Sequence, residues 1–330
     1  MITRRKALGQ FGTFSLGTVV GMSGLASPSA ALAQDKVKLR IGVVPVIDMA
    51  PFFAALKLGY FEAENIEVDT TPAPGGAAIL PALAAGQFEA AFSNTVSILL
   101  AIQEGIEFRF ITGGALNGPE PPDVLALYAR KDSNIKSASD LVGKRISTNT
   151  RNNIIWLRIR AWLEKNGVDP NKANLVEVPF PQAADALLGG QVDAASLYEP
   201  FMTSAIETHG DRLVRLGYPF GETSRASLIS QFAAMKGYIE KNPGVIERFA
   251  RAHAKGVDWV NKNRGSKELE DIIASFTRIP PERQRKMVFC AYDANLESAK
   301  VQEIADLMKR HGIGGRVPPA DQVIHSTARR

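Results

Sequence analysis

Four polar loops in this chain come directly before predicted helices, and their side chains are well placed to hold a small ligand. A helix begins with free backbone N–H groups and roughly half a positive charge, so its first turn attracts anions and carbonyl oxygens. The loops therefore indicate binding chemistry. The candidate side chains in them are Asp48, Met49, Ser93, Asn94, Thr95, Thr150, Arg151, Asn152, Asn153 and Tyr198.

Each candidate also has a plain structural interpretation. The run from Ser93 to Thr95 can serve only to cap a helix, and Tyr198 can be a core residue instead of a ligand contact. Arg151 can pair with an acidic ligand through its forked guanidinium, or it can lie solvated on the surface. Arg225, in a loop further along the chain, can face the same cleft or belong to a surface loop.

Two other motifs near these loops are better explained without a ligand. Glu199 stands directly before Pro200, where an acid suits the start of a helix. The pair Gly75-Gly76 is glycine-rich but has neither the Gly-x-Gly-x-x-Gly pattern nor a Gly-Lys-Ser sequence, so it predicts a tight turn rather than a phosphate site.

Motifs for catalysis and metal binding are absent from the sequence. The 4 histidines lack metal-ligand spacing, no Gly-x-Ser-x-Gly elbow is present, and no pair of acids stands out as a general acid and base. The single cysteine, Cys290, allows no intrachain disulfide and is interpreted as an inert core residue. We therefore predict no catalytic residue, no metal and no cofactor.

The candidate loops follow short apolar runs that predict β-strands. Such runs occur at residues 38–44, 90–92, 144–147 and 194–197, and each is followed by a loop and then a helix. Alternating strands and helices predict parallel sheets with helices on both faces, and we expect residues after 233 to be helical. Ligands of such sheets bind outside the carboxyl ends of the strands, where these loops lie.

A sequence motif that occurs twice in the chain predicts two similar lobes. Residues 83–93 and 187–201 both run from an apolar helix end through glycine, Gln, an apolar residue, an acid and two alanines into an apolar segment. Gly86, and Gly189 or Gly190, stand where a helix needs a left-handed residue to end. Chance likeness of two helix-to-strand junctions is the alternative. We predict a first lobe from residues 34–125, a second from 126–228, and a return to the first over 229–330, with a hinge and a cleft between the lobes.

The N-terminus predicts export. Residues 1–33 combine a basic start with an apolar stretch and the small-residue pattern Ala31-Leu32-Ala33, so we predict a signal peptide cleaved after Ala33. Thr3-Arg4-Arg5 resembles a twin-arginine signal, and an ordinary secretory signal is the alternative. The formal net charge is +5, of which +3 comes from Arg4, Arg5 and Lys6, leaving +2, which is too mild to indicate nucleic-acid binding.

Taken in order, the motifs resemble a known family, the periplasmic solute-binding proteins of ABC importers for nitrate, sulfonate, taurine and pyrimidine-type ligands. The likeness covers nearly the whole chain after the signal. The features that carry it are Gly42 to Phe61, Gly75-Gly76, Ala82 to Gly86, Ser139 to Lys144, Gly190 to Ala195, Glu199-Pro200, and Asn242-Pro243 with Trp259.

The resemblance implies an α/β fold of two lobes (the type II periplasmic-binding-protein fold), each with a mostly parallel sheet flanked by helices, joined by two hinge crossings. One small molecule would bind between the lobes, the hinge would close, and the closed monomer would dock at the inner membrane on a permease driven by an ATPase. The family's ligand contacts fall on the four candidate loops. We expect a periplasmic protein that is not an enzyme.

The resemblance leaves the ligand and some alternatives open. Arg151 and the helix starts favour an anionic organic ligand such as a sulfonate or an aromatic acid, whereas Tyr198 and Trp156 leave room for a pyrimidine. A nitrate binder and a periplasmic sensor that feeds no transporter are further alternatives. A pyrimidine synthase of thiamine biosynthesis shares the fold, but it carries a cysteine-rich motif that this chain lacks.

Overall fold

The computed structural model describes residues 36–328, which form one compact unit built on two β-sheets. The predicted signal peptide, its twin-arginine motif and its cleavage site lie outside the described residues. Within residues 36–328, no helix combines the length and the apolar character needed to cross a bilayer.

The first sheet has 6 strands in the order β11-β4-β10-β3-β1-β2. Strands β1, β2 and β3 are parallel, and β10 runs antiparallel to both β3 and β4. Small and β-branched residues line these strands, which suits burial between two helical layers. The strands are β1 (Val37–Val43), β2 (Ile66–Pro72), β3 (Ala90–Asn94), β4 (Phe108–Leu116), β10 (Leu228–Met235) and β11 (Ala291–Tyr292).

The second sheet has 5 strands in the order β7-β6-β8-β5-β9. Strands β6, β7 and β8 are parallel, whereas β5 pairs antiparallel with β8 and β9. The two sheets therefore share one arrangement of three parallel strands beside an antiparallel strand, as the repeated motif in the sequence predicted. The strands are β5 (Leu125–Arg130), β6 (Arg145–Thr148), β7 (Asn174–Glu177), β8 (Ala194–Tyr198) and β9 (Leu213–Gly217).

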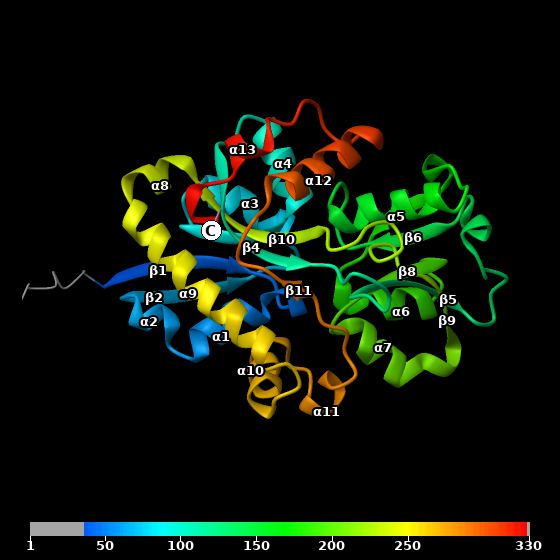
Figure 1. Cartoon of the computed structure of the whole chain (residues 1–330). Helices are drawn as coiled ribbons and strands as arrows, with labels where there is room; N and C mark the ends of the chain where they lie inside the picture. Colours follow the sequence, from blue (N-terminus) through cyan, green and yellow to red (C-terminus); the bar gives the residue numbers. More distant parts are fainter. Residues whose placement is uncertain (1–35, 329–330) are drawn as a thin grey trace, which may run out of the picture. The chain divides into compact units, whose positions relative to one another are not determined.

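Helices cover both faces of the first sheet, and we call this sheet with its helices the first lobe (Figure 1). One layer contains α1 (Ala50–Lys57), α2 (Tyr60–Ala63), α9 (Pro243–Lys262) and α10 (Lys267–Thr277). The other contains α3 (Gly76–Ala84), α4 (Thr95–Gln103), α12 (Ser298–Arg310) and α13 (Ala320–Val323). The short helices α8 (Lys236–Lys241) and α11 (Pro281–Gln284) complete this lobe.

The second sheet and its helices form the second lobe, with α5 on one side of the strands and α6 and α7 on the other (Figure 1). These helices are α5 (Ile154–Lys165), α6 (Ala183–Leu188) and α7 (Phe201–His209). Single turns of 3-10 helix complete the two lobes: η1 (Ile47–Met49), η2 (Ala138–Leu141), η3 (Pro170–Lys172), η4 (Phe180–Gln182), η5 (Gly210–Arg212) and η6 (Ser326–Ala328).

The chain passes between the sheets twice, between β4 and β5 and between β9 and β10. In each sheet, the strand that follows a crossing runs antiparallel to its neighbours. The two-lobed α/β fold is therefore confirmed, with two mixed sheets in which antiparallel pairings are at least as many as parallel ones. The exact lobe boundaries at residues 125 and 228 stay a prediction.

The helices that precede the two copies of the repeated motif end at left-handed glycines, as predicted. The expectation that residues after 233 are helical was wrong at two places. Gly86 and Gly190 both adopt the left-handed conformation, with φ of 72° and 73°. Strand β10 continues to Met235, and β11 is a further strand. Two residues are too few to show strand periodicity, and β11 is a strand through its antiparallel pairing with β4.

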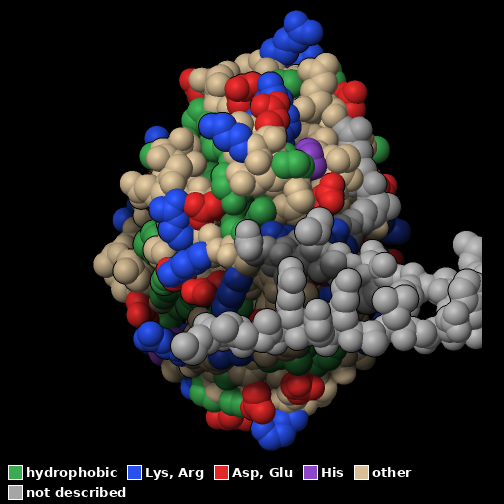
Figure 2. Space-filling model, turned by 90° about the vertical axis from the view of Figure 1, so that its left-hand side faces the viewer, with side chains coloured by type: hydrophobic (Ala, Val, Ile, Leu, Met, Phe, Trp, Pro, Cys, Tyr) green, Lys and Arg blue, Asp and Glu red, His purple; other side chains and the backbone are tan. Residues whose placement is uncertain are grey.

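Charged side chains on the surface are mixed in sign. Figure 2 shows Lys and Arg interspersed with Asp and Glu on the face drawn there. Lys38, for example, lies 3.3 Å from Asp69, and Lys267 lies 2.7 Å from Asp271. Exposed pairs of this kind contribute about 0–1 kcal/mol each, so the fold depends mainly on its buried cores.

Candidate functional site

A small pocket lies where the two lobes meet, and both lobes line it. The first lobe contributes residues from the end of β1, from η1, from the start of α3 and from β3 and β10. The second lobe contributes residues around the start of α5, from η4 and from the end of β8. The lining residues are Val44, Val46, Asp48, Gly75, Gly76, Phe92, Asn94, Asn149, Asn153, Ile154, Ile155, Phe180, Tyr198, Ile229 and Ser230.

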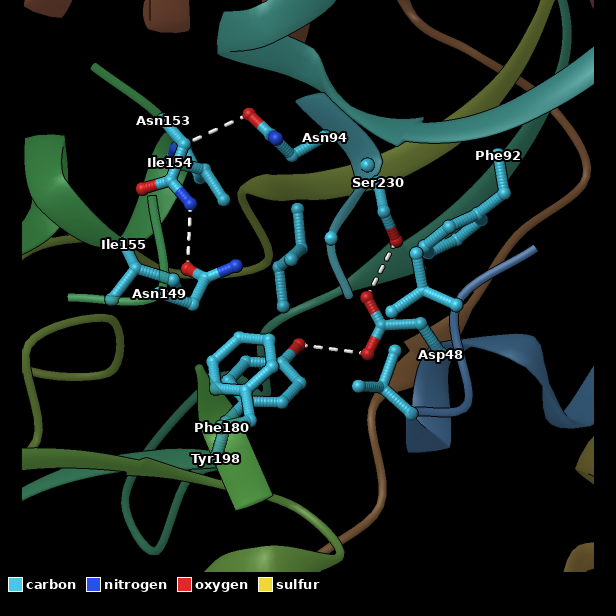
Figure 3. Close-up of a pocket in the computed structure, with 15 residues that line it drawn as sticks. Asp48, Phe92, Asn94, Asn149, Asn153, Ile154, Ile155, Phe180, Tyr198 and Ser230 are labelled. Atoms are coloured by element: carbon cyan, nitrogen blue, oxygen red, sulfur yellow. Dashed lines mark hydrogen bonds between the residues drawn. The ribbon is translucent and has the colours of Figure 1, made fainter. Parts of the chain in front are cut away.

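One end of the pocket is formed by the buried carboxyl group of Asp48. The hydroxyl of Tyr198, from the second lobe, donates to Oδ1 at 2.8 Å, and the hydroxyl of Ser230 donates to Oδ2 at 2.6 Å (Figure 3). The Cys290 thiol makes a longer contact with Oδ1 at 3.6 Å. Burial raises the pKa of Asp48, and the hydrogen bonds from Ser230 and Tyr198 oppose that rise.

Asparagines form the other side of the pocket, facing Asp48 across it (Figure 3). Asn94 caps α4 by accepting from the Ser97 N–H at 3.0 Å, and the same oxygen accepts from the Ile154 N–H at 3.1 Å. Asn153 caps α5 and donates to Asn149 at 2.6 Å. The starts of α4 and α5 therefore meet at this wall, and one asparagine oxygen bridges the two lobes.

Apolar and aromatic side chains form the remaining walls. The rings of Phe180 and Tyr198 stack with their centroids 5.2 Å apart and an interplanar angle of 29° (Figure 3). Ile154, Ile155 and Ile229 add aliphatic surface. A pocket of this composition suits a small organic molecule with a flat or apolar body and polar groups at its edges.

Four of the eleven candidate residues from the sequence line the pocket: Asp48, Asn94, Asn153 and Tyr198. Three others are buried beside it without lining it, namely Met49, Ser93 and Thr95. The Thr95 hydroxyl donates to the Gln231 side chain at 2.7 Å and so ties α4 to β10. Whether these residues contact a ligand stays a prediction.

The other four candidates, Thr150, Arg151, Asn152 and Arg225, do not line the pocket. Asn152 is left-handed (φ 50°), and this turn leaves Asn149 and Asn153 in the pocket while Arg151 and Asn152 line a separate outer groove. Trp156, which we expected to leave room for an aromatic ligand, lies in that groove beneath the Arg160 guanidinium.

Arg225 lies on the surface rather than in the cleft. Its side chain is 78% exposed and lies 3.9 Å from Glu120. The interpretation of Arg225 as part of a surface loop, which was the alternative, therefore describes its position better.

Several pocket residues were not predicted. Ser230 lies on β10, opposite Asn94 in the register of the sheet, so only the return of the chain to the first lobe brings it here. Gly75 and Gly76 were interpreted as a tight turn, yet a Cβ on Gly76 would lie 2.7 Å from the Ser93 Cα. Glycine is needed there because α3 approaches β3 closely. The Gly-Gly pair was the feature of the sequence that could have indicated this close approach.

Glu199 acts as the acid at a helix start, as its position before Pro200 predicted. Its carboxylate accepts from the Thr203 N–H at 3.1 Å in the first turn of α7, and from the Val288 N–H at 3.1 Å. Burial raises the pKa of Glu199 to about 7. This group is therefore part of the structure around the pocket rather than of its lining.

Replacing Asn94 with alanine should both destabilise the protein and loosen the contact between the lobes. The variant loses the α4 cap, which costs about 1 kcal/mol, and the acceptor for the Ile154 N–H. Ser266→Ala is the matched control, because Ser266 caps α10 with a 3.2 Å bond to Leu269 away from the pocket. We expect Asn94→Ala to lose more unfolding free energy than the control, and we expect a larger radius of gyration in solution scattering only for Asn94→Ala. Equal scattering curves would contradict the bridging role.

Comparison with known proteins agrees with this architecture. The model of a family described as NMT1/THI5 like matches residues 46–264. The putative binding protein YtlA of Bacillus subtilis (strain 168) is 24% identical over 319 residues, which cover 93% of each chain. The chain is thus similar over nearly its whole length to a binding protein rather than to an enzyme.

Solved structures share the fold. The alkanesulfonate-binding protein SsuA from Xanthomonas axonopodis pv. citri, bound to MOPS, aligns with a TM-score of 0.73 and 17% identity over 89% of this chain and 99% of its own. The periplasmic nitrate-binding protein NrtA from Synechocystis PCC 6803 aligns with a TM-score of 0.75 and 13% identity over 88% of this chain and 86% of its own. At these identities the likeness establishes the fold alone.

Proposed function

Because the chain belongs to the NMT1/THI5-like family and is the substrate-binding component of an ABC importer, we propose that it captures one small organic molecule in the pocket between its lobes. The observation that carries this proposal is that side chains of both lobes line a single pocket and hydrogen-bond across it. A ligand held by both lobes favours the state in which they are in contact.

The partners follow from the same proposal. The closed protein delivers its ligand to a membrane permease that is coupled to an ATPase. We propose that it acts as a monomer in the periplasm, after removal of residues 1–33, and that it touches the membrane only through the permease. Relatives of this family are periplasmic binding proteins, in keeping with this location.

The pocket favours an organic ligand over a small inorganic anion. The expectation of an anionic ligand depended partly on Arg151, which lines the outer groove instead. Among the described residues that line the pocket, none is a lysine, arginine or histidine. The positive ends of α3, α4 and α5 can still accept an oxygen-bearing group such as a sulfonate, a carboxylate or a ring carbonyl. Nitrate alone would leave the aromatic wall without a contact.

A ligand screen tests the proposed function. Residues 34–330 are unfolded and refolded to remove any retained ligand, and are then heated with alkanesulfonates, nitrate, aromatic carboxylates or pyrimidines. A micromolar ligand at 1 mM adds about 4 kcal/mol of stability, which raises the melting temperature by several degrees. The same ligand should reduce the radius of gyration. A ligand that stabilises the protein without compacting it would contradict closure between the lobes.

Two neighbouring asparagines supply a matched pair of variants for that ligand. Asn149→Ala should weaken its binding about tenfold or more, because a hydrogen bond lost in a closed pocket costs on the order of 1–3 kcal/mol. Asn152→Ala, three residues along the same loop, should leave affinity unchanged because Asn152 lies outside the pocket. Titration calorimetry measures both. The reverse order of effects would move the site to the outer groove.

A further inference from the structure

The outer groove on the second lobe brings together polar and aromatic side chains that do not reach the pocket, and we propose that it is a second binding site. The inferred ligand class is a small aromatic carboxylate, whose charge pairs with Arg151 and whose ring packs against Trp156 and Arg160. This site is separate from the pocket between the lobes, so the inference goes beyond the proposed function.

Two elements of the second lobe form the outer groove. One wall is α5 with the loop before it, which contributes Arg151, Asn152, Trp156 and Arg160. Trp156 and Arg160 are four residues apart, so they lie on the same face of the helix. The other wall is formed by residues 173–176 at the start of β7, the outermost strand of the second sheet. The groove therefore opens to solvent along the edge of this sheet.

The guanidinium groups of Arg151 and Arg160 give the groove a positive charge. Among the described residues that line the groove, none is an aspartate or a glutamate. Acids act on it only from outside the lining: Glu177 accepts from the backbone N–H of Arg151 at 2.8 Å, and Asp169 and Glu164 interact electrostatically with Arg160. This balance of charge favours an anionic ligand.

The two arginines differ in whether they are free to bind. Arg160 is fixed, because it donates to the Asn171 side chain at 2.8 Å and to the Pro170 carbonyl at 3.3 Å. Arg151 is exposed, and in the part of the chain that the structure describes its guanidinium has no hydrogen bond or ion pair. A guanidinium can offer two parallel N–H groups to a carboxylate. Arg151 is therefore the group that we expect to hold the charge of the ligand.

A flat, partly apolar surface lies beside these charges. The Arg160 guanidinium carbon lies 4.6 Å from the centroid of the Trp156 ring, so the two planar groups form one platform. Leu175 and Val176 add aliphatic surface, and Val176 is 36% exposed. Such a platform binds a flat ring by stacking. An aromatic ring with a carboxylate uses both the platform and Arg151, whereas an inorganic anion or a neutral ring uses only one of them.

The outer groove and the pocket share one loop, residues 149–153. Asn149 and Asn153 line the pocket, whereas Arg151 and Asn152 line the groove, and the left-handed Asn152 (φ 50°) separates the two sets. Asn149 is tied to Asn153 by a 2.6 Å hydrogen bond (Figure 3). A ligand that holds Arg151 restricts this loop and so changes the freedom of Asn149 in the pocket. We therefore expect occupancy of one site to change affinity at the other.

Titration calorimetry on refolded residues 34–330 tests the groove with two pairs of probes. We expect 2-naphthoate to bind about tenfold or more tightly than the uncharged 2-naphthamide, because the pair differs by one charge-assisted hydrogen-bonding group. Benzoate should bind more tightly than cyclohexanecarboxylate, which has the same charge but no flat ring. Raised salt should weaken 2-naphthoate binding, because Arg151 is exposed and its charge is screened.

Three variants locate the bound 2-naphthoate. Arg151→Gln should weaken its binding about tenfold or more, and the exposed position of Arg151 makes misfolding of this variant no concern. Arg225→Gln removes the same charge from a surface outside the groove and is the matched control. Asn149→Ala alters the pocket instead of the groove. Both of these should leave 2-naphthoate binding unchanged in the absence of a pocket ligand.

Several results would overturn the second site. They are the absence of binding by both benzoate and 2-naphthoate at millimolar concentration, equal binding of 2-naphthoate and 2-naphthamide, and a loss in Asn149→Ala that equals or exceeds the loss in Arg151→Gln. All three leave the proposed function intact, because that function depends on a ligand in the pocket.

The coupling between the two sites has its own measurement, and this part alone rests on the proposed function. The pocket ligand found by the screen is titrated with and without saturating 2-naphthoate, and 2-naphthoate is titrated with and without the pocket ligand. We expect the same fold-change in both experiments, as linkage requires, and no change in Arg151→Gln. Unchanged affinities in the unsubstituted protein would overturn the coupling but not the second site.

Discussion

Gly256→Ala should lower the melting temperature by roughly 6–12 °C, because α9 and α1 approach each other too closely there for a side chain. A Cβ on Gly256 would lie 2.2 Å from the Pro51 carbonyl oxygen and 2.9 Å from the Ala55 Cβ. A backbone carbonyl cannot rotate away, so the helices must separate. Overpacking of this kind costs about 3 kcal/mol, with about 2–4 °C of melting temperature per kcal/mol.

Gly244→Ala is the matched control in the same helix. No heavy atom lies within 4 Å of a Cβ at Gly244, and alanine favours the helix over glycine by up to about 1 kcal/mol. We therefore expect an unchanged or slightly higher melting temperature by scanning calorimetry. Equal destabilisation by the two substitutions would show that the cost lies in α9 itself rather than in its packing.

The Gly256 contact also bears on the pocket. Helix α1 follows directly on η1, the turn that carries Asp48. A shift of α1 would therefore move Asp48 relative to Tyr198, with which it shares a 2.8 Å hydrogen bond. We expect the alanine variant to bind ligand more weakly as well as to melt earlier.

Much of the architecture was predictable because it depends on local pattern. The strand–loop–helix order and the glycines Gly86 and Gly190 are encoded by residues close together in the chain. The start of α9 at Pro243, after Asn242, is equally local. The close approach at Gly256 was not predictable, because it depends on which helix lies opposite α9.

The site was predictable to the level of loops rather than of side chains. Loops at the carboxyl ends of parallel strands converge by topology, which brought Asp48 and Asn94 to one pocket. The choice between Asn149 and Asn152 depends on one left-handed residue, and no periodicity in the sequence reports it. Ser230 comes from an antiparallel return strand, so its place next to Asn94 depends on the pairing of β10 with β3.

The second large effect is expected for Arg158→Met, because Arg158 joins the second lobe to the crossing before β10 and to α12. It lies on α5, is 1% exposed, and donates to Ser227 directly before β10 and to Thr223 at 3.4 Å. It also forms the 3.2 Å ion pair with Glu303. Methionine keeps the apolar stem but removes the charge. Removing one partner of a buried pair costs about 3–5 kcal/mol, and we expect the lower end because Glu303 is partly exposed.

The pH dependence separates lost charge from lost packing in Arg158→Met. Asp123 lies two residues before β5. Burial raises its pKa to about 6, and the hydrogen bonds from the Val124 and Gly221 N–H groups and the charge of Arg158 oppose that rise. A carboxyl group whose pKa is raised on folding destabilises the folded state above its unfolded pKa, near 4. Without Arg158 that pKa rises further, so the difference in unfolding free energy between the two proteins should be smallest at pH 4.5 and largest at pH 8.

Urea unfolding at pH 4.5, 6 and 8 measures this difference, and Glu303→Gln is the control for the exposed half of the pair. That control should cost less than about 1 kcal/mol, since Glu303 is 43% exposed. A loss in Arg158→Met that is equal at all three pH values would place the cost in packing. Arg158 contacts Thr223 and Ser227 at the crossing before β10, and its ion pair with Glu303 of α12 joins the two lobes. None of these residues lines the pocket, so the walls that hold the ligand remain in Arg158→Met. Arg158→Met should therefore melt early and still become more compact on binding ligand, whereas Asn94→Ala should be impaired mainly in compaction.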